Sequence, residues 1–364
     1  MNVPSLTIRA VRSTPVEVPM NHVLGTSRAA LRAAPLLLVD VETEEGVTGH
    51  AYLFCYMRQA APAIAVMVAA VEELVKGKPI EPEETWRTLE RRFTLIGVQG
   101  IVRMAMSGLD VACWDALAKA SGKPLVEFLG AESRAIPAYN SNGLGLMPLA
   151  ALAKEADELL EGGFGGVKLR LGYPTLADDL AAVRAVRERL PKGVALMVDY
   201  NQALTVEEAL ERGRALDGEG LYWIEEPIRH DDYAGAARLA RELATPIQIG
   251  ENFSQPHAME EALRQEACDY VMPDLERIGG VSGWMRAAKI ASARGVPMSS
   301  HLFPEVSAHL LAASSTAHWI EYVDWAAAVL REPTQVIEGR IAPRRDPGAG
   351  LEWDVQAVER FRMK

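Results

Sequence analysis

The sequence predicts an α/β protein in which an N-terminal α+β domain precedes a parallel barrel. In the first third of the chain, three strand-like runs are followed by helical patterns, an order typical of α+β domains. From residue 136 on, short apolar runs alternate with amphipathic helical patterns, as parallel strands joined by crossover helices require. Polar residues close seven of these apolar runs at intervals of 20 to 31 residues, about the length of one strand–helix unit.

The N-terminal part contains three predicted strands, over residues 5–18, 36–42 and 46–53. Residues 19–35 lack a periodic core pattern, and a connection of that length is often a functional lid, so a loop is predicted there. Three helices are predicted over residues 60–76, 82–93 and 102–120.

The barrel is predicted to begin with a strand at residues 136–141 and to end with one at residues 319–322. The helices predicted between them cover residues 149–161, 177–189, 206–216, 233–243, 258–266, 281–294 and 306–314. From residue 325 on, short runs interrupted by prolines predict a tail that packs back on the N-terminal domain.

The composition excludes several classes of partner. A net charge of −11 argues against nucleic acid and against an anionic membrane surface. It still permits an anionic substrate, because a bound divalent cation inverts the local sign of charge. The three cysteines are far apart in apolar runs, which is typical of buried thiols in a reducing compartment. Without a signal-peptide pattern or an apolar run of about 20 residues, we expect a soluble cytoplasmic protein.

Three carboxylates, Asp199, Glu225 and Glu251, close adjacent predicted strands. Because the C-terminal ends of barrel strands converge on one mouth, these side chains should meet there. Three oxygen ligands, completed by water and a substrate oxygen, suit a hard octahedral ion and predict a Mg²⁺ site. Each carboxylate could instead be a helix cap or a surface charge, but their regular spacing favours the metal. Glu226 should point away from the site and is assigned a structural role.

Five further residues close strands at the same mouth. Lys168 and Arg170 are two positions apart and therefore share one face of their strand. Asp274 and His301 lie on neighbouring predicted strands, where a carboxylate bound to one imidazole nitrogen fixes the tautomer and makes the other nitrogen more basic. Glu321 closes the last strand, where it could act as a neutral acid or hydrogen-bond donor.

With these motifs in place, the chain resembles the enolase superfamily, and within it the mandelate racemase subgroup (mandelate racemase/muconate lactonizing enzyme-like). The stretches that carry the resemblance are Val-Lys-Leu-Arg-Leu-Gly-Tyr-Pro, Met-Val-Asp-Tyr-Asn-Gln, Trp-Ile-Glu-Glu-Pro, Gly-Glu-Asn-Phe, Met-Pro-Asp-Leu-Glu-Arg-Ile-Gly-Gly, Ser-Ser-His-Leu-Phe-Pro-Glu-Val-Ser-Ala-His and His-Trp-Ile-Glu. The resemblance implies a capping α+β domain with a substrate lid (residues 1–130), a modified (β/α)7β TIM-type barrel (131–325) and a C-terminal segment that packs back on the capping domain (326–364). It also implies a homo-oligomer, since octamers are common in the family.

The resemblance further implies a role for each candidate residue. Mg²⁺ would be bound by Asp199, Glu225 and Glu251. His301 would be the base and Asp274 its orienting partner, while Lys168 would neutralise the substrate carboxylate and Glu321 would hydrogen-bond the enolate oxygen. The predicted catalytic residues are therefore His301, Asp274, Lys168, Arg170 and Glu321. The predicted substrate-binding residues are Asn201, Ser141, Arg277, His22 and Arg58.

One position departs from the family pattern, because the second lysine of the subgroup's Lys-x-Lys motif is Arg170 here. Arginine stays protonated in proteins and cannot serve as a base. A racemase needs a base on each face of the carbanion, whereas a dehydratase can use His301 alone. The sequence therefore predicts Mg²⁺-dependent removal of the α-proton of a 2-hydroxy carboxylate through an enediolate, as in acid-sugar (aldonate or aldarate) dehydration. The alternative is a mandelate racemase-like racemase or epimerase. Lid residues His22, Arg28 and Arg32, with Arg58 on a later loop, favour a polar substrate over an aryl one.

Two other classes of function fit less well. A glycosidase on a barrel would place two carboxylates at the mouth without a metal triad. A non-catalytic metal-binding protein would have no use for the Asp274–His301 pair or for Glu321.

Overall fold

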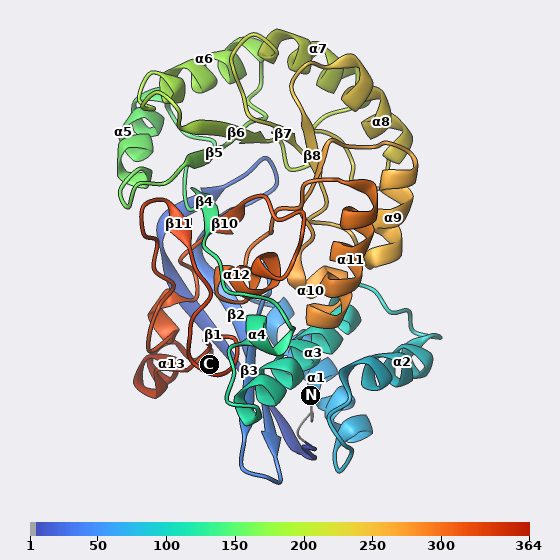
Figure 1. The fold of residues 1–364 in the computed structure, drawn as a ribbon. Coiled ribbons are helices and arrows are strands. Elements are labelled where there is room, and N and C mark those ends of the chain that lie inside the picture. The colour runs from blue at the N-terminus through green and yellow to red at the C-terminus, as the bar shows by residue number, and fades with distance from the viewer. Residues whose placement is uncertain (1–4) are drawn as a thin grey trace.

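The computed structural model describes residues 5–364, which form a capping domain beside a ring of parallel strands (Figure 1). The first four residues, part of the stretch that lacks a signal-peptide pattern, lie outside the described residues. None of the helices within residues 5–364 combines the length and apolar character needed to cross a membrane.

The capping domain is an antiparallel three-stranded sheet covered by helices. Its strands, in the order β1–β2–β3, are β1 (Ile8–Gly25), β2 (Ala30–Thr43) and β3 (Thr48–Phe54). Its helices are α1 (Ala60–Val75), α2 (Pro82–Phe93), α3 (Gly100–Ala120) and α4 (Leu125–Phe128). Helix α3 is apolar almost all round because it packs on the sheet and also contacts α10 and α11 of the barrel.

The loop predicted over residues 19–35 is wrong, because most of this stretch is paired strand. Strands β1 and β2 form a long ribbon that continues to Leu24 opposite Leu31 and Gly25 opposite Ala30, after a register shift beyond Pro19. Only residues 26–29 remain as the turn. The ribbon carries partly exposed polar and small side chains, so the two-residue alternation that signals a half-buried strand is missing there.

The barrel prediction is confirmed. Its parallel strands are β4 (Ile136–Asn140), β5 (Gly166–Arg170), β6 (Ala195–Asp199), β7 (Ile224–Glu225), β8 (Ile247–Ile249), β9 (Tyr270–Val271) and β10 (Ile320–Tyr322), in the order β10–β4–β5–β6–β7–β8–β9. The strand predicted to end at His301 is reduced to isolated bridges, in which Met298 pairs with Val271 and Ala317 and His301 pairs with Asp274. These bridges span the interval between β9 and β10.

Helices surround the ring on its outer side (Figure 1). They are α5 (Leu149–Leu159), α6 (Leu176–Arg187), α7 (Val206–Leu216), α8 (Tyr233–Glu242), α9 (Pro256–Arg264), α10 (Leu275–Ile278), α11 (Gly280–Arg294) and α12 (Pro304–Ala312). Side-chain caps begin several of them, including a reciprocal Thr205–Glu208 capping box on α7. The short helix α10 was not predicted.

The C-terminal segment returns to the capping domain. A short strand, β11 (Arg340–Ile341), pairs antiparallel with β4, between the 3₁₀ turn Ala327–Val329 and helix α13 (Val355–Phe361). Beyond α13, the amide of Met363 donates a hydrogen bond to the carbonyl oxygen of Pro15 on β1 at 3.0 Å. The tail therefore ties the first strand of the capping domain to the end of the chain.

Gly49 of β3 marks the closest approach between the capping sheet and α3. A Cβ added there would meet the carbonyl oxygen of Ala112 at 1.9 Å and the Cβ of Ala116 at 2.8 Å. We expect Gly49→Ala to lower the free energy of unfolding by about 1–3 kcal/mol, because the packed helix must shift. Gly218→Ala, whose added Cβ would meet nothing within 4 Å, is the matched control and should be nearly neutral. Chemical denaturation measures both, and equal stability of the Gly49 variant would contradict this close packing.

Candidate active site

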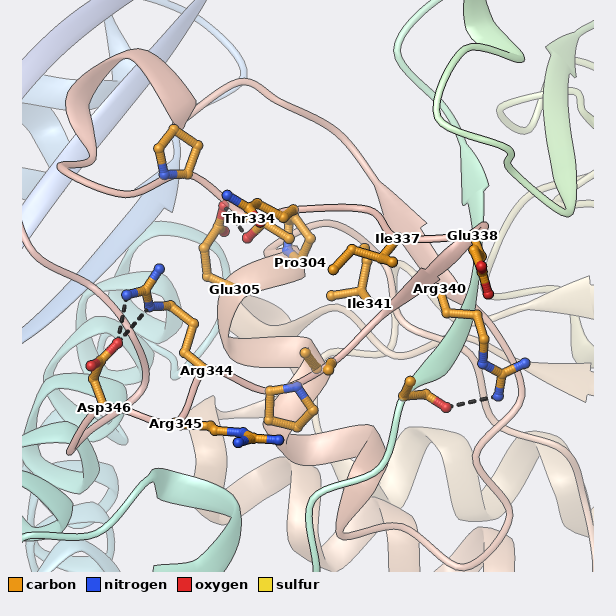
Figure 2. A pocket seen from close by; sticks show the side chains of 16 residues that line it. Pro304, Glu305, Thr334, Ile337, Glu338, Arg340, Ile341, Arg344, Arg345 and Asp346 are labelled. Carbon is orange, nitrogen blue, oxygen red and sulfur yellow. Dashed lines mark hydrogen bonds and ion pairs between the residues drawn. The ribbon is translucent and has the colours of Figure 1, made fainter.

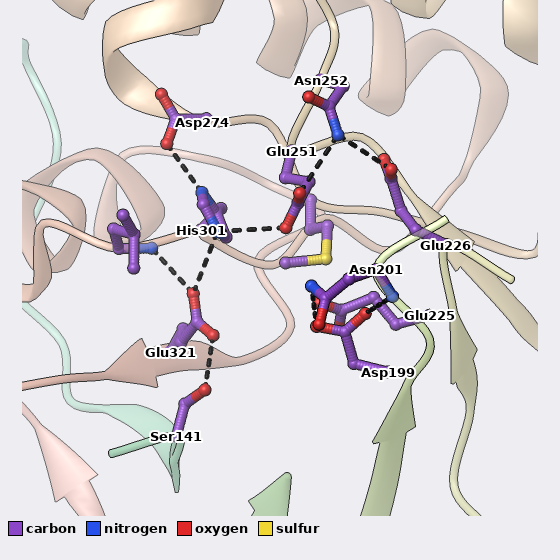
Figure 3. Close-up of polar contacts among 12 residues, drawn as sticks. Ser141, Asp199, Asn201, Glu225, Glu226, Glu251, Asn252, Asp274, His301 and Glu321 are labelled. Carbon is purple, nitrogen blue, oxygen red and sulfur yellow. Dashed lines mark hydrogen bonds and ion pairs between the residues drawn. The ribbon is translucent and has the colours of Figure 1, made fainter. Parts of the chain in front are cut away.

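The three predicted metal ligands meet at the C-terminal mouth of the barrel (Figure 3). Asp199 ends β6 and Glu225 ends β7, and the two residues are directly paired in the parallel register. Glu251 follows β8, and one carboxylate oxygen from each of the three residues lies within 4.8 Å of the others. This set of hard oxygen donors fits Mg²⁺, which prefers carboxylate and water oxygens.

Neighbouring donors hold two of these carboxylates in place. Asn201, which has a left-handed backbone conformation, donates its amide N–H to Asp199 at 2.7 Å and its side-chain Nδ2 at 2.9 Å. The Trp223 Nε1 and the Gln248 Nε2 donate to Oε2 of Glu225 at 3.1 and 3.2 Å. The barrel itself therefore holds Asp199 and Glu225 in their orientations.

The triad concentrates negative charge in a buried place. Burial raises the pKa of Glu225 to about 8, with Asp199 and other carboxylates adding to the effect against the opposing charge of Lys168. Burial and the nearby Glu251 likewise raise the pKa of Glu226 to about 8. Glu226 accepts hydrogen bonds from the Gly250 amide and from Asn252, which also donates to Glu251. A divalent cation would relieve this repulsion, so the charge of the site also fits Mg²⁺.

His301 and Asp274 form the expected pair. Nδ1 of His301 lies 2.6 Å from Oδ2 of Asp274, whose Oδ1 accepts hydrogen bonds from the backbone amides of Glu276 and Arg277. Nε2 of His301 faces the metal site, 3.2 Å from Glu251. Burial works to lower the pKa of His301, but Glu251, Glu321 and the Asp274 hydrogen bond raise it well above its ordinary value. Asp274 thus holds Nδ1 and leaves Nε2 directed at the triad.

Lys168 and Glu321 are linked at the floor of the site. Nζ of Lys168 lies 2.5 Å from Glu225 and 2.7 Å from Oε1 of Glu321. Glu321 also accepts hydrogen bonds from the Ser141 hydroxyl at 2.7 Å and from the Leu302 amide at 2.9 Å. Burial would raise the pKa of Glu321, but Lys168 and His301 lower it to about 2. This arrangement favours the ionised form of Glu321, in contrast to the neutral acid that the sequence predicts.

Arg170 is fixed by the loop that follows β4. Its Nη1 donates to the carbonyl oxygens of Ser141 and Gly143 at 2.9 and 2.7 Å, and its Nη2 donates to the Ser141 hydroxyl at 2.9 Å. Its Nε is buried without a partner among the described residues. The guanidinium therefore supplies a fixed positive charge at the position where the family pattern has a second lysine.

These groups surround a cavity of about 260 Å³. That volume is below the roughly 300–1,000 Å³ of pockets for drug-sized ligands, which indicates a small ligand. The barrel residues that line it are Lys168, Arg170, Asp199, Asn201, Gln202, Glu251, Asn252, Arg277, His301, Leu302 and Glu321. The capping-domain residues that line it are Leu24, Thr26, Arg28, Ala29, Leu31, Phe54 and Tyr56.

Three of the predicted substrate-binding residues do not line this cavity. His22 pairs with Glu155 at 3.1 Å, and Arg58 forms an ion pair with Glu17. Ser141 lies behind Arg170 and Glu321 and is fully buried. Sequence position placed His22 and Arg58 near the lid but could not show which way they point.

Tyr56 lines the cavity without any local sequence signal, and its ring lies under the Arg277 guanidinium at 4.6 Å. The Arg28 side chain, at the ribbon tip, donates to the carbonyl oxygens of Asn201 and Gln202, and the Ser27 hydroxyl donates to the carbonyl oxygen of Tyr200 at 3.1 Å. The tip of the capping ribbon is thereby docked on the loop after β6. No local sequence pattern predicts these contacts between the domains.

A second, larger cavity of about 590 Å³ lies between α12 and the C-terminal segment (Figure 2). Its buried acid, Glu305, accepts hydrogen bonds from Tyr52 and Thr334, and its Arg344 is paired with Asp346. It contains neither the triad nor the His301–Asp274 pair, so the chemistry belongs to the smaller cavity.

Comparisons with known proteins agree with this geometry. The L-talarate/galactarate dehydratase of Salmonella typhimurium is 30% identical to this chain, over 94% of this chain and 87% of the dehydratase. An enolase from alpha proteobacterium BAL199, solved with bound magnesium, is 42% identical, with a TM-score of 0.96 over 98% of this chain and 100% of that one. A Bradyrhizobium enolase, solved with magnesium and mandelic acid, is 39% identical, with a TM-score of 0.95 over 99% of both chains.

The magnesium in these neighbours supports a magnesium site at the carboxylate triad. Residues 8–130 match the family described as mandelate racemase / muconate lactonizing enzyme, N-terminal domain. Residues 151–358 match the family described as enolase C-terminal domain-like. The chain therefore belongs to the enolase superfamily, in its mandelate racemase and muconate lactonizing enzyme subgroup.

Proposed function

We propose that the chain is a Mg²⁺-dependent dehydratase of an acid sugar, an aldonate or an aldarate. The observation that carries the proposal is the convergence of a metal triad and a single imidazole base in one small cavity. The similarity to a talarate/galactarate dehydratase supports the same substrate class.

The reaction begins when Nε2 of His301 takes the proton from the α-carbon of the substrate. The electron pair of the broken C–H bond passes into the carboxylate and forms an enediolate. Bound Mg²⁺ supplies positive charge that stabilises this dianion. Asp274 accepts a hydrogen bond from Nδ1 of His301, which stabilises the imidazolium and fixes the orientation of the ring. Lys168 and Arg170 supply fixed positive charge for the substrate carboxylate.

The same imidazolium can complete an elimination. The C–O bond at the β-carbon breaks, the proton on His301 passes to the departing oxygen, and water leaves. The remaining enol tautomerises to a 2-keto-3-deoxy acid. One base suffices for this sequence, whereas racemisation needs a second base on the opposite face of the carbanion. Arg170, which is held by Ser141 and Gly143, cannot act as that base.

Three cavity-lining residues carry buried polar atoms without a partner among the described residues. They are the Tyr56 hydroxyl, the Arg170 Nε and the Asn201 Oδ1. Buried polar groups are costly unless hydrogen-bonded. A substrate with several hydroxyl groups would satisfy such atoms, and an aryl acid would leave most of them unpaired.

Screening a library of aldonates and aldarates for Mg²⁺-dependent 2-keto acid formation tests the proposal. A racemase or epimerase is the alternative, favoured by the mandelic acid bound in the Bradyrhizobium neighbour and by the apolar lining residues Leu24, Leu31 and Phe54. Racemisation of mandelate, with no dehydration of any acid sugar, would replace the proposal with that alternative.

Arg170 provides a stereochemical prediction. In D₂O, only the enantiomer whose α-hydrogen faces His301 should exchange that hydrogen, because arginine cannot act as a base. Arg170→Lys should gain exchange on the opposite face, since a lysine near a metal and another cation can lose its proton near neutrality. Arg170→Met, which removes the charge without adding a base, is the control. Proton NMR measures the exchange of the α-hydrogen of each enantiomer in D₂O. Rapid exchange of this hydrogen in both enantiomers by the wild type would rule out the one-base mechanism.

We also propose that the protein works as a cytoplasmic homo-oligomer. Leu95 and Ile96, between α2 and α3, are largely exposed apolar side chains, which often mark subunit contacts. The free thiols of Cys55, Cys113 and Cys268 suit a reducing compartment. A monomer in light scattering at micromolar concentration would exclude the oligomer.

A further inference from the structure

The end of β3 meets the segment that carries Asp274. Strand β3 is an edge strand of the capping sheet, so some of its backbone amides have no strand partner. The amide of Phe54, the last residue of β3, donates instead to Oε2 of Glu276 at 3.0 Å. Glu276 is 1% exposed and is the second residue of α10, two positions after Asp274.

Glu276 touches the catalytic pair as well as the capping domain. Its own backbone amide donates to Oδ1 of Asp274 at 2.8 Å, while Oδ2 of Asp274 holds His301 at 2.6 Å. One residue therefore binds the Asp274 carboxylate through its main chain and β3 through its side chain. A shift of β3 would be passed to Asp274 through a single rigid turn of helix.

Two flanking tyrosines, Tyr52 on β3 and Tyr56 just after it, contact the same part of the barrel. The ring of Tyr56 lies under the guanidinium of Arg277 at 4.6 Å. The hydroxyl of Tyr52 donates to Oε2 of Glu305 at 2.7 Å, and its ring lies 5.0 Å from that of Phe303. Every barrel residue in these contacts lies within four positions of Asp274 or His301. The end of β3 thus docks on the two segments that carry the pair.

We propose that Glu276 is a positioning residue, which binds the Phe54 amide and so fixes the orientation of Asp274 and, through it, of His301. The capping domain then has a second task besides covering the cavity, because its edge strand sets the geometry of the base. The inference rests on the proposed function only in taking His301 as the base.

Glu276→Gln should keep the wild-type geometry of the His301–Asp274 pair and the wild-type kcat. Burial, followed by the neighbouring charge of Asp274, raises the pKa of Glu276 well above its ordinary value, which favours a neutral side chain. The Glu276 Oε1 has no partner among the described residues, so an amide NH₂ can occupy that place while the remaining oxygen accepts from Phe54. Alanine, in contrast, removes the acceptor and leaves the Phe54 amide buried and unpaired.

The test compares Glu276→Ala and Glu276→Gln with a matched control, Asp110→Ala. Asp110 is also a buried carboxyl that joins the two domains, because it accepts hydrogen bonds from the Ser282 amide and hydroxyl of α11 at 2.9 and 2.6 Å. The hydrogen-bond donors to Asp110 belong to α11 and not to the His301–Asp274 pair, so its loss should lower thermal stability without disturbing the pair.

Two measurements are made on the Mg²⁺-loaded protein. The first is the downfield proton NMR resonance of the His301 Nδ1–H bound to Asp274, assigned by its absence in His301→Asn; it needs no substrate. The second is kcat and KM for acid-sugar turnover.

We expect Glu276→Ala to shift or broaden the resonance and to lower kcat by about 10- to 100-fold, with a smaller change in KM. Glu276→Gln should match the wild type in both, and Asp110→Ala should keep the wild-type resonance and kcat. A wild-type resonance in Glu276→Ala would overturn the inference. The inference would also fail if Asp110→Ala disturbed the resonance equally, or if Glu276→Gln lost as much kcat as Glu276→Ala. The resonance is measured without substrate. If the protein dehydrated no acid sugar, the proposed function would be refuted, and the resonance would still test the role of Glu276.

Discussion

Replacing His301 with asparagine should abolish turnover while leaving the fold and Mg²⁺ binding intact. Loss of a general base typically lowers the rate by about 10²- to 10⁴-fold, and the loss is larger where no other base can substitute. Here Arg170 cannot take the proton, and the carboxylates Glu251 and Glu321 lie beside Nε2 of His301. The measurement is kcat on the identified acid sugar, together with solvent deuterium incorporation at the α-carbon.

Asparagine is chosen because its amide can still donate to Asp274 and so avoids an unpaired buried carboxylate. His257→Asn provides the matched control, since His257 lies on α9 with a side chain that is 77% exposed, and it should keep wild-type activity. If His301→Asn retained most of its kcat, the base would be another residue, and Lys168 would be the first to test.

Glu225→Gln should remove Mg²⁺ binding and, with it, activity. Glu225 is fully buried in the triad, so the change takes away one of three carboxylate ligands and its charge. Mutations of residues that only support metal ligands cost about 10- to 100-fold in affinity, so loss of a direct ligand should exceed about 100-fold. Isothermal titration calorimetry with Mg²⁺ measures the change, and the exposed Glu260→Gln on α9 serves as control.

Thermal and pH measurements extend this prediction. Mg²⁺ at about 100 times its Kd should stabilise the wild type by about 2.7 kcal/mol and the variant hardly at all. Burial raises the pKa of Glu225 to about 8, so a proton competes with the metal below that pH. The Mg²⁺ affinity of the wild type should therefore rise as the pH increases from 6 toward 8 and then level off. An affinity that is independent of pH, or unchanged in Glu225→Gln, would contradict the assignment of this ligand.

The strand ends of the barrel could be read from the sequence because each is a local pattern. An apolar run closed by a polar residue and followed by a helix recurs at a regular interval, and the C-terminal ends of parallel strands necessarily meet. That geometry brought Asp199, Glu225 and Glu251 together, and it placed His301 beside Asp274. The order of strands and helices predicted the N-terminal α+β domain, and the family resemblance added its capping position and the enediolate chemistry.

The remaining features depend on contacts that have no local signal. His22 lies on the β1–β2 ribbon and Arg58 on the loop between β3 and α1. Their side chains pair with Glu155 and Glu17 instead of reaching the cavity. The bond from Phe54 to Glu276 joins residues more than 200 positions apart. Such contacts are set by how the two domains dock, which periodicity along one segment does not encode.

The pairing of β10 with β4 affects the order in which the barrel is completed during synthesis of the chain. Ile320 of β10 pairs with Ala138 of β4, so the first strand of the ring gains this partner only after some 180 further residues have been synthesised. Until then β4 presents an open strand edge, which invites pairing with other chains. Glu321 arrives on that same late strand, while Lys168 and the triad are made well before it. The catalytic mouth is thus among the last features of the barrel to be completed, and a chain stalled before residue 320 holds the metal ligands without the strand that closes the ring around them.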